Sequence, residues 1–560
     1  MSNHFRIAMS WVHTWFGLVL GFVLMVVFFF GALSVFDREI DRWALSNTRF
    51  AVQPMPSFDK VLLPAFRRIQ PDVTEYQQQI GQLHDARRGP PPARQALPPD
   101  EYWAYTTHRD PVLRMGVGFT VPQARNPSEH NHIHGETVID PRSGQALNDS
   151  QLKLGSQFFF PMHYQLNLPW PTLGYWLVGL AGLIMLVALV SGVILHRKLF
   201  RELFTFRVGK PGQRRTLDLH NLSGVVALPF HFFFAFTGLM IFASIYLPVS
   251  DTLLKPLHDA HEIAEARQTG LPHQRAGQPA ALASVDAMMA EAKRRWAARG
   301  MAGEIGFLQI QHLGDLNSYV SIYRAGSDRV ALVGEAIHFQ GSSGKVLYED
   351  PPATVLGSIN TFLTGLHLQH FRHWTLRWLY LGGGLLGCIC IATGFVFFIG
   401  KRRRQQDSQR NGQADLVEAL AVTAVCGMLL ATVAIMLASQ VLPETLAERG
   451  LWQQRLFWLT WLGALCHAGY YARRPLHGGF SAAWWQQCAA LAILTASAVL
   501  ANWWHTGDHL GHTLFQYWPV AGVDLVLLMC GLLAAHTAQR LYRRGQEVQT
   551  RQPIGALSNG

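Results

Sequence analysis

Eight apolar segments, each of about 20 residues or more, alternate with polar stretches along the chain. About 20 helical residues cross the hydrocarbon core of a bilayer, so each segment predicts a membrane span. The predicted spans are 11–36, 173–196, 222–247, 377–400, 416–441, 454–473, 483–503 and 520–541. Span 483–503 has the weakest pattern, because it begins with two tryptophans and contains two glutamines. The pattern predicts a predominantly α-helical, polytopic membrane protein.

Two long polar segments, 37–172 and 248–376, separate the first four spans. Both contain a stretch with apolar residues at helical spacing and shorter stretches that read as strands, so each predicts a small α+β module. The helical stretches are 58–67 and 283–296, and the strand-like stretches are 102–107, 137–140, 307–311, 319–323 and 336–339.

The two modules share a turn. Residues 140–147 (DPRSGQAL) resemble residues 340–347 (QGSSGKVL), and in both a Ser-Gly pair precedes two apolar residues, which suits a hairpin. Span, module and span therefore occur twice within residues 1–400. The expected order is span 1–36, module 37–172, spans 173–247 with a basic loop, module 248–376, span 377–403, linker 404–415, a four-helix membrane unit 416–545 and a disordered tail 546–560. Residues 80–100 and 264–282 are rich in Pro, Gly, Arg or Gln and are expected to be flexible loops.

Charge sets the expected orientation. Of the 560 residues, 49% are hydrophobic and only 15% are charged, and the net charge is +11. The basic residues gather in short loops that fall on one side if the N-terminus is inside, which predicts cytoplasmic termini and modules that are periplasmic or extracellular. This distribution favours contact with membrane lipid and argues against nucleic-acid binding. All six cysteines lie in or beside spans, so no disulfide framework is expected.

The first four spans each carry a histidine at or near a membrane face: His13, His163, His220 and His367. Ionisable side chains near a membrane interior are costly and by default mark a functional site. Neutral imidazole is also a common axial ligand of haem iron. With the N-terminus inside, His13 and His220 form an inner pair and His163 and His367 an outer pair, which suits two stacked bis-histidine b-type haems.

Other histidines compete for these roles. On a straight helix His231 would lie about 20° round and about 16 Å deeper than His220, and could serve a second haem unless Pro229 bends the helix. His196, at the basic end of the second span, could ligate, meet a haem propionate or extend to the interface. His370 is a reserve for His367.

Two further groups of histidines lie outside the spans. His130, His132 and His134 alternate, so on a strand they would share one face and could contact a metal or a ferric ligand, as could His373; a polar loop is the alternative. His505, His509 and His512 with Asp508 share helical spacing, so transition-metal binding is weighed there against a solvated loop.

The chain also resembles PepSY-associated transmembrane proteins. The matching pieces run in order from His13-Thr-Trp-Phe-Gly-Leu through Ser191-Gly192, Leu219-His-Asn-Leu-Ser-Gly224, Leu366-His367 and Thr393-Gly394, within residues 5–403. This resemblance implies four helices, PepSY-like periplasmic modules and haem b. It further implies inner-membrane reduction of a ferric siderophore, as in some members of the family, while the last four spans exceed the usual family length.

No GxGxxG, Walker A or flavin signature stands in a strand–turn–helix context, so no built-in NAD(P)H or flavin site is expected. Electrons would come from a separate donor, either a cytoplasmic reductase or quinol, and the expected activity is that of a haem-dependent ferric siderophore reductase in iron acquisition. Two alternatives stay open: a haem-free PepSY scaffold that regulates an envelope protease, and a transporter for iron or another metal.

Overall fold

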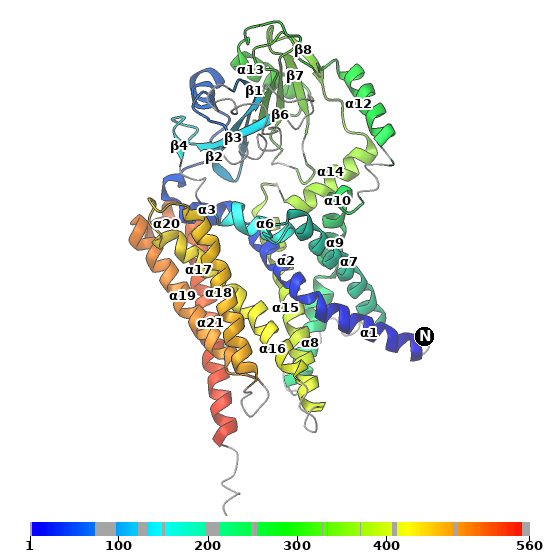
Figure 1. Cartoon of the computed structure of the whole chain (residues 1–560), viewed down its shortest axis with the longest axis vertical. Helices are drawn as coiled ribbons and strands as arrows, with labels where there is room; N and C mark the ends of the chain where they lie inside the picture. Colours follow the sequence, from blue (N-terminus) through cyan, green and yellow to red (C-terminus); the bar gives the residue numbers. More distant parts are fainter. Residues whose placement is uncertain are drawn as a thin grey trace, which may run out of the picture. The chain divides into compact units, whose positions relative to one another are not determined.

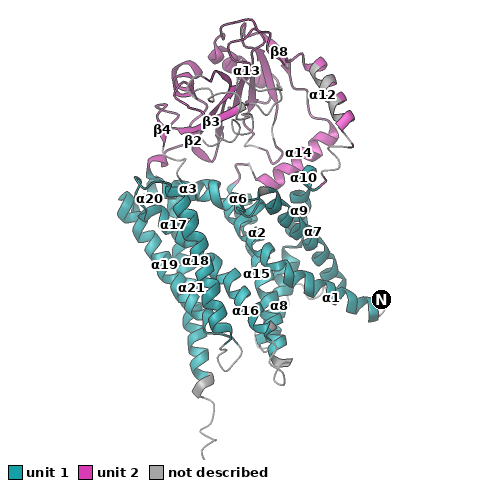
Figure 2. Ribbon diagram, in the orientation of Figure 1, with its two compact units in different colours: residues 1–46, 151–246, 374–560 teal, residues 47–150, 247–373 magenta. Residues whose placement is uncertain are grey.

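The computed structural model describes residues 3–72, 97–120, 132–147, 152–196, 212–247, 253, 255–272, 274–326, 329–332, 334–369, 371–405, 412–473 and 480–550. The chain forms two compact units (Figure 2). The membrane unit comprises residues 1–46, 151–246 and 374–560, and the sheet unit comprises residues 47–150 and 247–373. Each unit is therefore assembled from segments that are far apart in the sequence.

The membrane unit contains long apolar helices where the hydrophobic pattern predicts them (Figure 1). Five are long and apolar enough to cross a membrane, and the number rises to seven if each of two bent helix pairs is one span. The five lie in α7 (Pro171–Leu195), α15 (Trp374–Gln405), α16 to α17 (Gln413–Val441, with the π-helical turn η7 at Thr423–Gly427), α19 (Ala483–Thr506) and α21 (Trp518–Thr550). Predicted span 483–503 is among them. Predicted span 454–473 lies in α18 (Arg449–Ala472) and does not meet the same criterion.

Both bent pairs begin a predicted repeat. Helices α1 (Asn3–Val19) and α2 (Gly21–Ser34) meet at 60°, and α8 (Gly212–Val226) and α9 (Leu228–Ile241) meet at 61°. Pro229 lies in the first turn of α9 and has no N–H to donate to the preceding turn. The 61° bend therefore lies beside the proline that was considered as its cause. His13 and His220 lie on the first limb of their pairs, at the same sequence distance before the second limb starts.

Each bent pair packs one limb on its own repeat and the other limb on the other repeat. The first limbs pack within their own repeat, α1 on α7 and α8 on α15, whereas the second limbs cross over, α2 onto α15 and α9 onto α7. Glycines permit close approach where the helices cross: a Cβ at Gly384 would meet Ala32 at 2.8 Å, and one at Gly387 would meet Phe28 at 2.4 Å. The first four predicted spans are thus interlocked.

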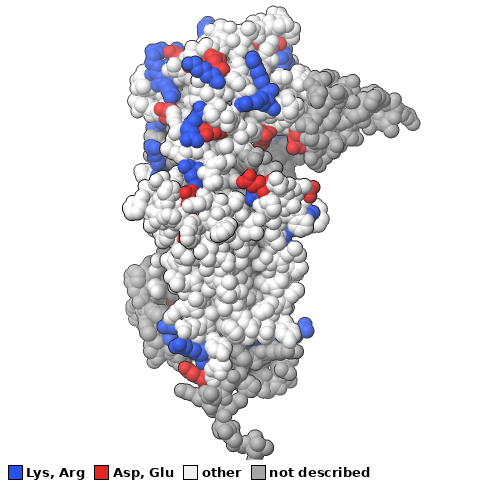
Figure 3. All heavy atoms as spheres, turned by 90° about the vertical axis from the view of Figure 1, so that its left-hand side faces the viewer, with Lys and Arg blue, Asp and Glu red and all other residues white. Residues whose placement is uncertain are grey.

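The outer surfaces of these helices are apolar. On α7 the exposed side chains recur every three or four residues, as in a single helical stripe: Leu173, Trp176, Leu180, Leu183, Val187 and Val190. Figure 3 faces the side of Figure 1 on which α18 and α19 lie, and this face of the C-terminal helices also carries a band without Lys, Arg, Asp or Glu, with basic side chains below it. An apolar band of this kind is what lipid tails require.

The C-terminal helices pack against helices of both repeats. Besides α16–α19 and α21, they include α20 (Leu510–Gln516), and they contact α15, α2 and the short helix α3 (Asp37–Ala44). Trp43 Nε1 donates to Asp524 Oδ1 at 2.7 Å, and Arg42 donates to the Tyr517 hydroxyl at 2.7 Å. Because these contacts lie inside one compact unit, the helices after residue 404 are part of the same membrane body as the first four spans.

Two buried ion pairs hold the ends of α15. At its start, Arg377 donates to Glu39 Oε1 at 2.8 Å and to the Val35 carbonyl at 2.7 Å. At its end, Arg403 pairs with Glu418, whose side chain is fully buried and also accepts the Ser481 N–H at 2.6 Å. Since a buried charge is stable only when it is paired and hydrogen-bonded, these contacts fix α15 at both ends.

The sheet unit is built on one eight-stranded antiparallel sheet in the order β4-β3-β2-β1-β5-β6-β7-β8. The first polar segment supplies β1 (Pro99–Thr107), β2 (Asp110–Thr120), β3 (His132–Ile139) and β4 (Ala146–Leu147). The second supplies β5 (Ile305–Gln311), β6 (Tyr319–Arg324), β7 (Ala336–Gln340) and β8 (Val346–Glu349). β1 pairs with β5, with Tyr102 opposite Ile310, so the two segments share a single sheet.

The shared turn has the same backbone structure in both halves. The N–H of Gly144 donates to the Asp140 carbonyl at 2.8 Å, and the N–H of Gly344 donates to the Gln340 carbonyl at 2.8 Å. Both glycines have positive φ, 71° and 72°, a conformation that costs side-chain-bearing residues. The hairpins β3–β4 and β7–β8 predicted from this turn are confirmed.

Helices from both halves cover one face of the sheet and share one core. They are η2 (Phe58–Leu62) with α4 (Leu63–Phe66) from the first half, and α13 (Val285–Ala298) from the second. Phe66 stacks on Tyr102 with ring centroids 4.4 Å apart, and Trp296 is buried in the same cluster. Asp286 on α13 accepts the Ser57 hydroxyl at 2.6 Å and the Phe58 N–H at 2.7 Å, which joins the two helical layers.

Several boundaries differ from the predictions. Expected loop 264–282 begins inside α12 (Lys255–Thr269), and α15 and α16 extend into the expected linker 404–415. Expected tail 546–560 begins inside α21, which runs to Thr550. In each case local polarity suggested a loop where the helix continues beyond its apolar part. Most of expected loop 80–100 lies outside the described residues, although β1 takes its last two positions. All six cysteines are free, as expected.

Candidate functional site

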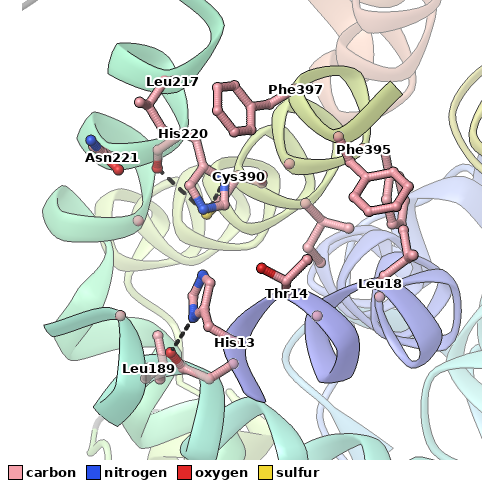
Figure 4. A pocket seen from close by; sticks show the side chains of 18 of the residues that line it. His13, Thr14, Leu18, Leu189, Leu217, His220, Asn221, Cys390, Phe395 and Phe397 are labelled. Carbon is pink, nitrogen blue, oxygen red and sulfur yellow. Dashed lines mark hydrogen bonds between the residues drawn. The ribbon is translucent and has the colours of Figure 1, made fainter. Parts of the chain in front are cut away.

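A pocket of about 770 Å³ opens between the two repeats of the membrane unit. His13 on α1 and His220 on α8 both line it and point toward one another across it (Figure 4). Their ring centroids are 6.2 Å apart and their ring planes are inclined by 80°. The structure therefore brings together the two histidines of the predicted inner pair.

Each of these histidines uses the same ring nitrogen to bind the neighbouring helix. His13 Nδ1 lies 3.0 Å from the Ala188 carbonyl on α7, and His220 Nδ1 lies 2.7 Å from the Cys390 carbonyl on α15. A carbonyl only accepts hydrogen bonds, so in both rings Nδ1 carries the proton and Nε2 keeps its lone pair. Metal-ligating histidines show this arrangement, because the outer hydrogen bond fixes the tautomer and orients the ring.

A glycine lies one helical turn after each acceptor carbonyl and makes room for the ring. A Cβ built at Gly192 would stand 3.2 Å from His13 Cε1, and one built at Gly394 would stand 3.4 Å from His220 Cε1. The two sites thus have the same construction: a histidine on the first limb of a bent pair, a carbonyl on the last helix of the same repeat, and a glycine one turn later.

His163 repeats this construction on other helices. It lies on α6 (Phe160–Tyr164), and its Nδ1 is 2.8 Å from the Val27 carbonyl on α2. A Cβ at Gly31, one turn after Val27, would approach His163 Nδ1 to 2.7 Å. His163 is therefore held in the same manner as the two inner histidines.

His231 is held differently. Its Nε2, not its Nδ1, faces a backbone carbonyl, that of Gly383 at 3.3 Å, and its ring packs against Phe28 with centroids 5.2 Å apart. The 61° bend between α8 and α9 also separates it from His220, so the straight-helix alignment considered for these two residues does not apply. His231 lines the pocket, and its role as a haem ligand stays a prediction.

The pocket has an apolar wall and a basic rim. Leu24, Phe28, Met185 and Ile391 are among its apolar lining residues. Its polar lining includes the four basic side chains His196, Arg214, Lys401 and Arg402. Such a pocket suits a large, flat, apolar ligand that carries anionic groups at one edge, because the wall excludes water while the rim neutralises charge.

The geometry fits a haem between the two inner histidines. A metal–imidazole bond is about 2 Å long, so two rings that share one metal ion have centres about 6 Å apart. The separation of 6.2 Å between His13 and His220 agrees with this value. The described residues contain no group of three or more His, Cys, Asp and Glu arranged around a metal ion, but axial ligation of haem requires only two imidazoles.

The other predicted residues that the structure describes are not among those that line this pocket. His367 lies on α14 (Val355–Leu368), and His373 is exposed just before α15; both belong to the sheet unit. His132 and His134 lie on β3, opposite Thr120 and Gly118 of β2, and His134 is exposed. His130 and His370 lie outside the described residues. The pairing of His163 with His367 stays a prediction.

The group at the end of α19 also stays unassigned. His512 Nδ1 lies 2.9 Å from Asp508 Oδ1, whereas His505 Nδ1 faces Gln440 Oε1 at 3.3 Å. His505 and His512 thus have separate partners.

Sequence reasoning did not detect the acceptor carbonyls, since backbone groups have no signature in a sequence. The Ser191-Gly192 and Thr393-Gly394 pairs were visible signals, because each places a glycine beside a hydroxyl residue near the end of an apolar span. Their structural role appears only once the histidines are seen against them.

Comparison with known proteins agrees with this architecture. The family model described as "PepSY-associated TM region" matches residues 10–401, which include α2, α7 to α9, the whole sheet and most of α1 and α15. The chain belongs to the PepSY-associated transmembrane family. Within this PepSY-associated protein, the matched region ends inside α15, so α16 to α21 lie beyond it.

A curated relative matches a similar share of the chain. The PepSY-associated chain is 26% identical over 397 residues to "Uncharacterized protein PA4219" of Pseudomonas aeruginosa, across 66% of this chain and 91% of the relative. The relative's own length is thus almost entirely covered, while a third of the present chain has no counterpart in the alignment.

Proposed function

We propose that this protein is a di-haem b electron-transfer protein of the bacterial inner membrane, which reduces a periplasmic acceptor, iron(III) held by a siderophore. The observation that carries the proposal is the paired histidines His13 and His220, both with Nδ1 engaged by a backbone carbonyl and Nε2 presented to one pocket. Membership of the PepSY-associated family and the apolar helices support a membrane location.

The residues of the pocket would each have a defined role. His13 and His220 would hold the iron of the inner haem, and Arg214, Lys401 and Arg402 would pair with its propionates. A bound b-type haem would supply reversible one-electron chemistry at its iron. Two imidazole ligands leave no open coordination position, so the protein would favour electron transfer over oxygen binding. The apolar wall would keep water from the site, which stabilises the ligand geometry and influences the potential.

The proposal includes a second haem toward the periplasmic side. His163 supports it, because this histidine has the same carbonyl and glycine construction as the inner ligands. His367 is its partner as predicted from the sequence. The electron donor would be separate, either a cytoplasmic reductase or quinol, and reduction to iron(II) would weaken its hold by hard oxygen chelators.

A reduced-minus-oxidised spectrum with haem stoichiometry tests the proposal. Protein purified from haem-replete cells should show low-spin haem bands that sharpen with dithionite, with two haems per chain. His13→Ala and His220→Ala should each remove one haem and retain the other. His4→Ala, at an exposed position on the same helix as His13, serves as the matched control and should retain both. A colourless preparation would refute haem binding, and retention of both haems in the two variants would refute the inner ligand pair.

The acceptor needs its own measurement. Pre-reduced protein mixed with a ferric siderophore under anaerobic conditions should be reoxidised, with one iron(II) formed for each haem electron lost. Haem that stays reduced with ferric siderophores of different classes would refute this acceptor, while the spectrum would still report on haem binding.

A further inference from the structure

The acceptor carbonyls behind the two inner histidines each carry a second hydrogen-bond donor. On α7, the Ser191 hydroxyl donates to the Ala188 carbonyl at 3.0 Å, the same oxygen that accepts from His13. On α15, the Thr393 hydroxyl lies 2.9 Å from the Cys390 carbonyl that accepts from His220. In both helices the hydroxyl residue stands directly before the glycine that accommodates the ring.

These two hydroxyls do not contact their histidines equally. Ser191 Oγ lies 3.2 Å from His13 Nδ1, so the hydroxyl and the imidazole N–H stand side by side at the one carbonyl oxygen to which both donate. Thr393 Oγ1 is closer to the Ile389 carbonyl, at 2.6 Å, than to the Cys390 carbonyl. The atom beside His220 Nδ1 is instead the Cys390 sulfur, at 3.6 Å. Ser191 is therefore coupled more directly to its histidine than Thr393.

At His163 the hydroxyl is missing. Val27 supplies the carbonyl and Gly31 the space, but the residue before that glycine is Phe30, which is completely buried. The three sites thus share a carbonyl and a glycine and differ in the residue before that glycine, which is a serine, a threonine or a phenylalanine.

A carbonyl that already accepts a hydroxyl is a weaker acceptor for an imidazole N–H. A weaker N–H···O bond leaves less negative charge on the ring, so the histidine donates less electron density to a metal on Nε2. Less electron donation favours the reduced metal and raises its potential. The strength of this hydrogen bond is therefore a means of adjusting a haem potential without any contact to the haem.

We infer that Ser191, and to a smaller extent Thr393, are positioning residues that raise the midpoint potential of the inner haem by competing for the carbonyl oxygens that bind His13 and His220. This inference rests on the proposed function, because it requires a haem between these histidines. The side chain of Ser191 is nearly inaccessible, 2% exposed, so it acts only through the carbonyl and the imidazole.

Redox titration of the purified full chain separates this role from a packing role. Ser191→Ala removes one oxygen and suits a helix, so the fold should be retained. The inner haem should then keep full occupancy while its midpoint potential falls, and Thr393→Ala should lower it less. Ser191→Thr restores a hydroxyl at the same backbone position and should return the potential toward that of the unmodified protein. The potential of the outer haem should not move in any of the three variants.

Unchanged potentials in Ser191→Ala with normal haem content would overturn the inference and leave the proposed function intact. If Ser191→Ala lost haem, recovery in Ser191→Thr would support a role for the hydroxyl, and failure to recover would reduce Ser191 to a packing residue. Absence of haem from the unmodified protein would instead refute the proposed function itself.

Discussion

Replacing Gly192 tests whether the inner histidines need a glycine-faced helix. An added Cβ at this position would stand 3.2 Å from His13 Cε1, closer than the 3.4–4 Å of ordinary contact. In Gly192→Ala the His13 ring must therefore shift by a few tenths of an ångström, which lengthens its 3.0 Å contact with the Ala188 carbonyl. We expect this displacement to weaken inner-haem binding.

The size of the effect follows from the costs of overpacking. Inserting extra methyl groups into a packed interior costs about 1–3 kcal/mol. For Gly192→Ala we expect a cost at the low end of this range, which corresponds to about fivefold weaker haem binding. For Gly192→Val we expect a cost toward the high end, which corresponds to about 100-fold weaker binding. Alanine and valine also change helix propensity, but that change is the same with and without haem, so it cancels in the affinity.

Haem titration of the apo-protein, followed by Soret absorbance, measures these affinities. Gly394→Ala should bind almost normally, since its Cβ would stand 3.4 Å from His220, at the limit of ordinary contact. Gly382→Ala on the same helix has nothing within 4 Å and is the matched control. Equal haem affinities in Gly192→Val and Gly382→Ala would refute the prediction, because they would show that the His13 ring does not pack against Gly192.

Three further predictions concern stability. Arg377→Met removes the Arg377 ion pair of the buried Glu39 carboxylate, so the free energy of unfolding should fall by about 3–5 kcal/mol in thermal or denaturant unfolding. The double variant with Glu39→Gln should recover part of this loss, and strictly additive losses in the two single variants would contradict the pairing. Gly344→Ala forces a side chain to φ 72° and should cost about 1–2 kcal/mol with faster hydrogen exchange in the β7–β8 hairpin, whereas unchanged exchange would contradict it. The pKa of Glu291 is lowered from 4.5 to about 2 by its two neighbouring arginines, so its small stabilising contribution is present above pH 4.5 and is lost as the pH falls to 2. Glu291→Gln should remove this part of the pH dependence of Tm, and a Tm that falls below pH 4.5 just as in the unmodified protein would contradict the prediction.

Hydrophobic periodicity was sufficient to predict most elements. Apolar helices, the five predicted strands, helix 283–296 and the shared turn appear near their predicted residues, because each depends on local spacing, whereas β2 was not predicted and β4 and β8 were expected only from the turn. The prediction that His13 and His220 lie at one membrane depth also follows from local pattern, since both open an apolar run. Their meeting across one pocket rests on the repeat, which was visible in the sequence.

Other features depend on partners far away in the chain and left no local signal. The pairing of Tyr102 with Ile310, which joins the two halves of the sheet, is of this kind. So is the first bend, which occurs at Leu20 without a proline, where a Cβ at Gly21 would meet the Phe395 ring at 3.0 Å. The backbone acceptors of the histidines could not be predicted either, because every residue has a carbonyl and only packing selects one.

The β1–β5 pairing has a consequence for how the protein is made. β1 ends at Thr107 and its partner β5 begins at Ile305, with α7, α8 and α9 between them. At about 5–20 residues per second, roughly 10–40 s separate the synthesis of the two strands. During that interval the inner edge of the first half has no partner, and an open strand edge is a template for aggregation. The chain therefore makes α7, α8 and α9 before β1 gains β5 as its neighbour, so the eight-stranded sheet is completed only after both polar segments have been synthesised.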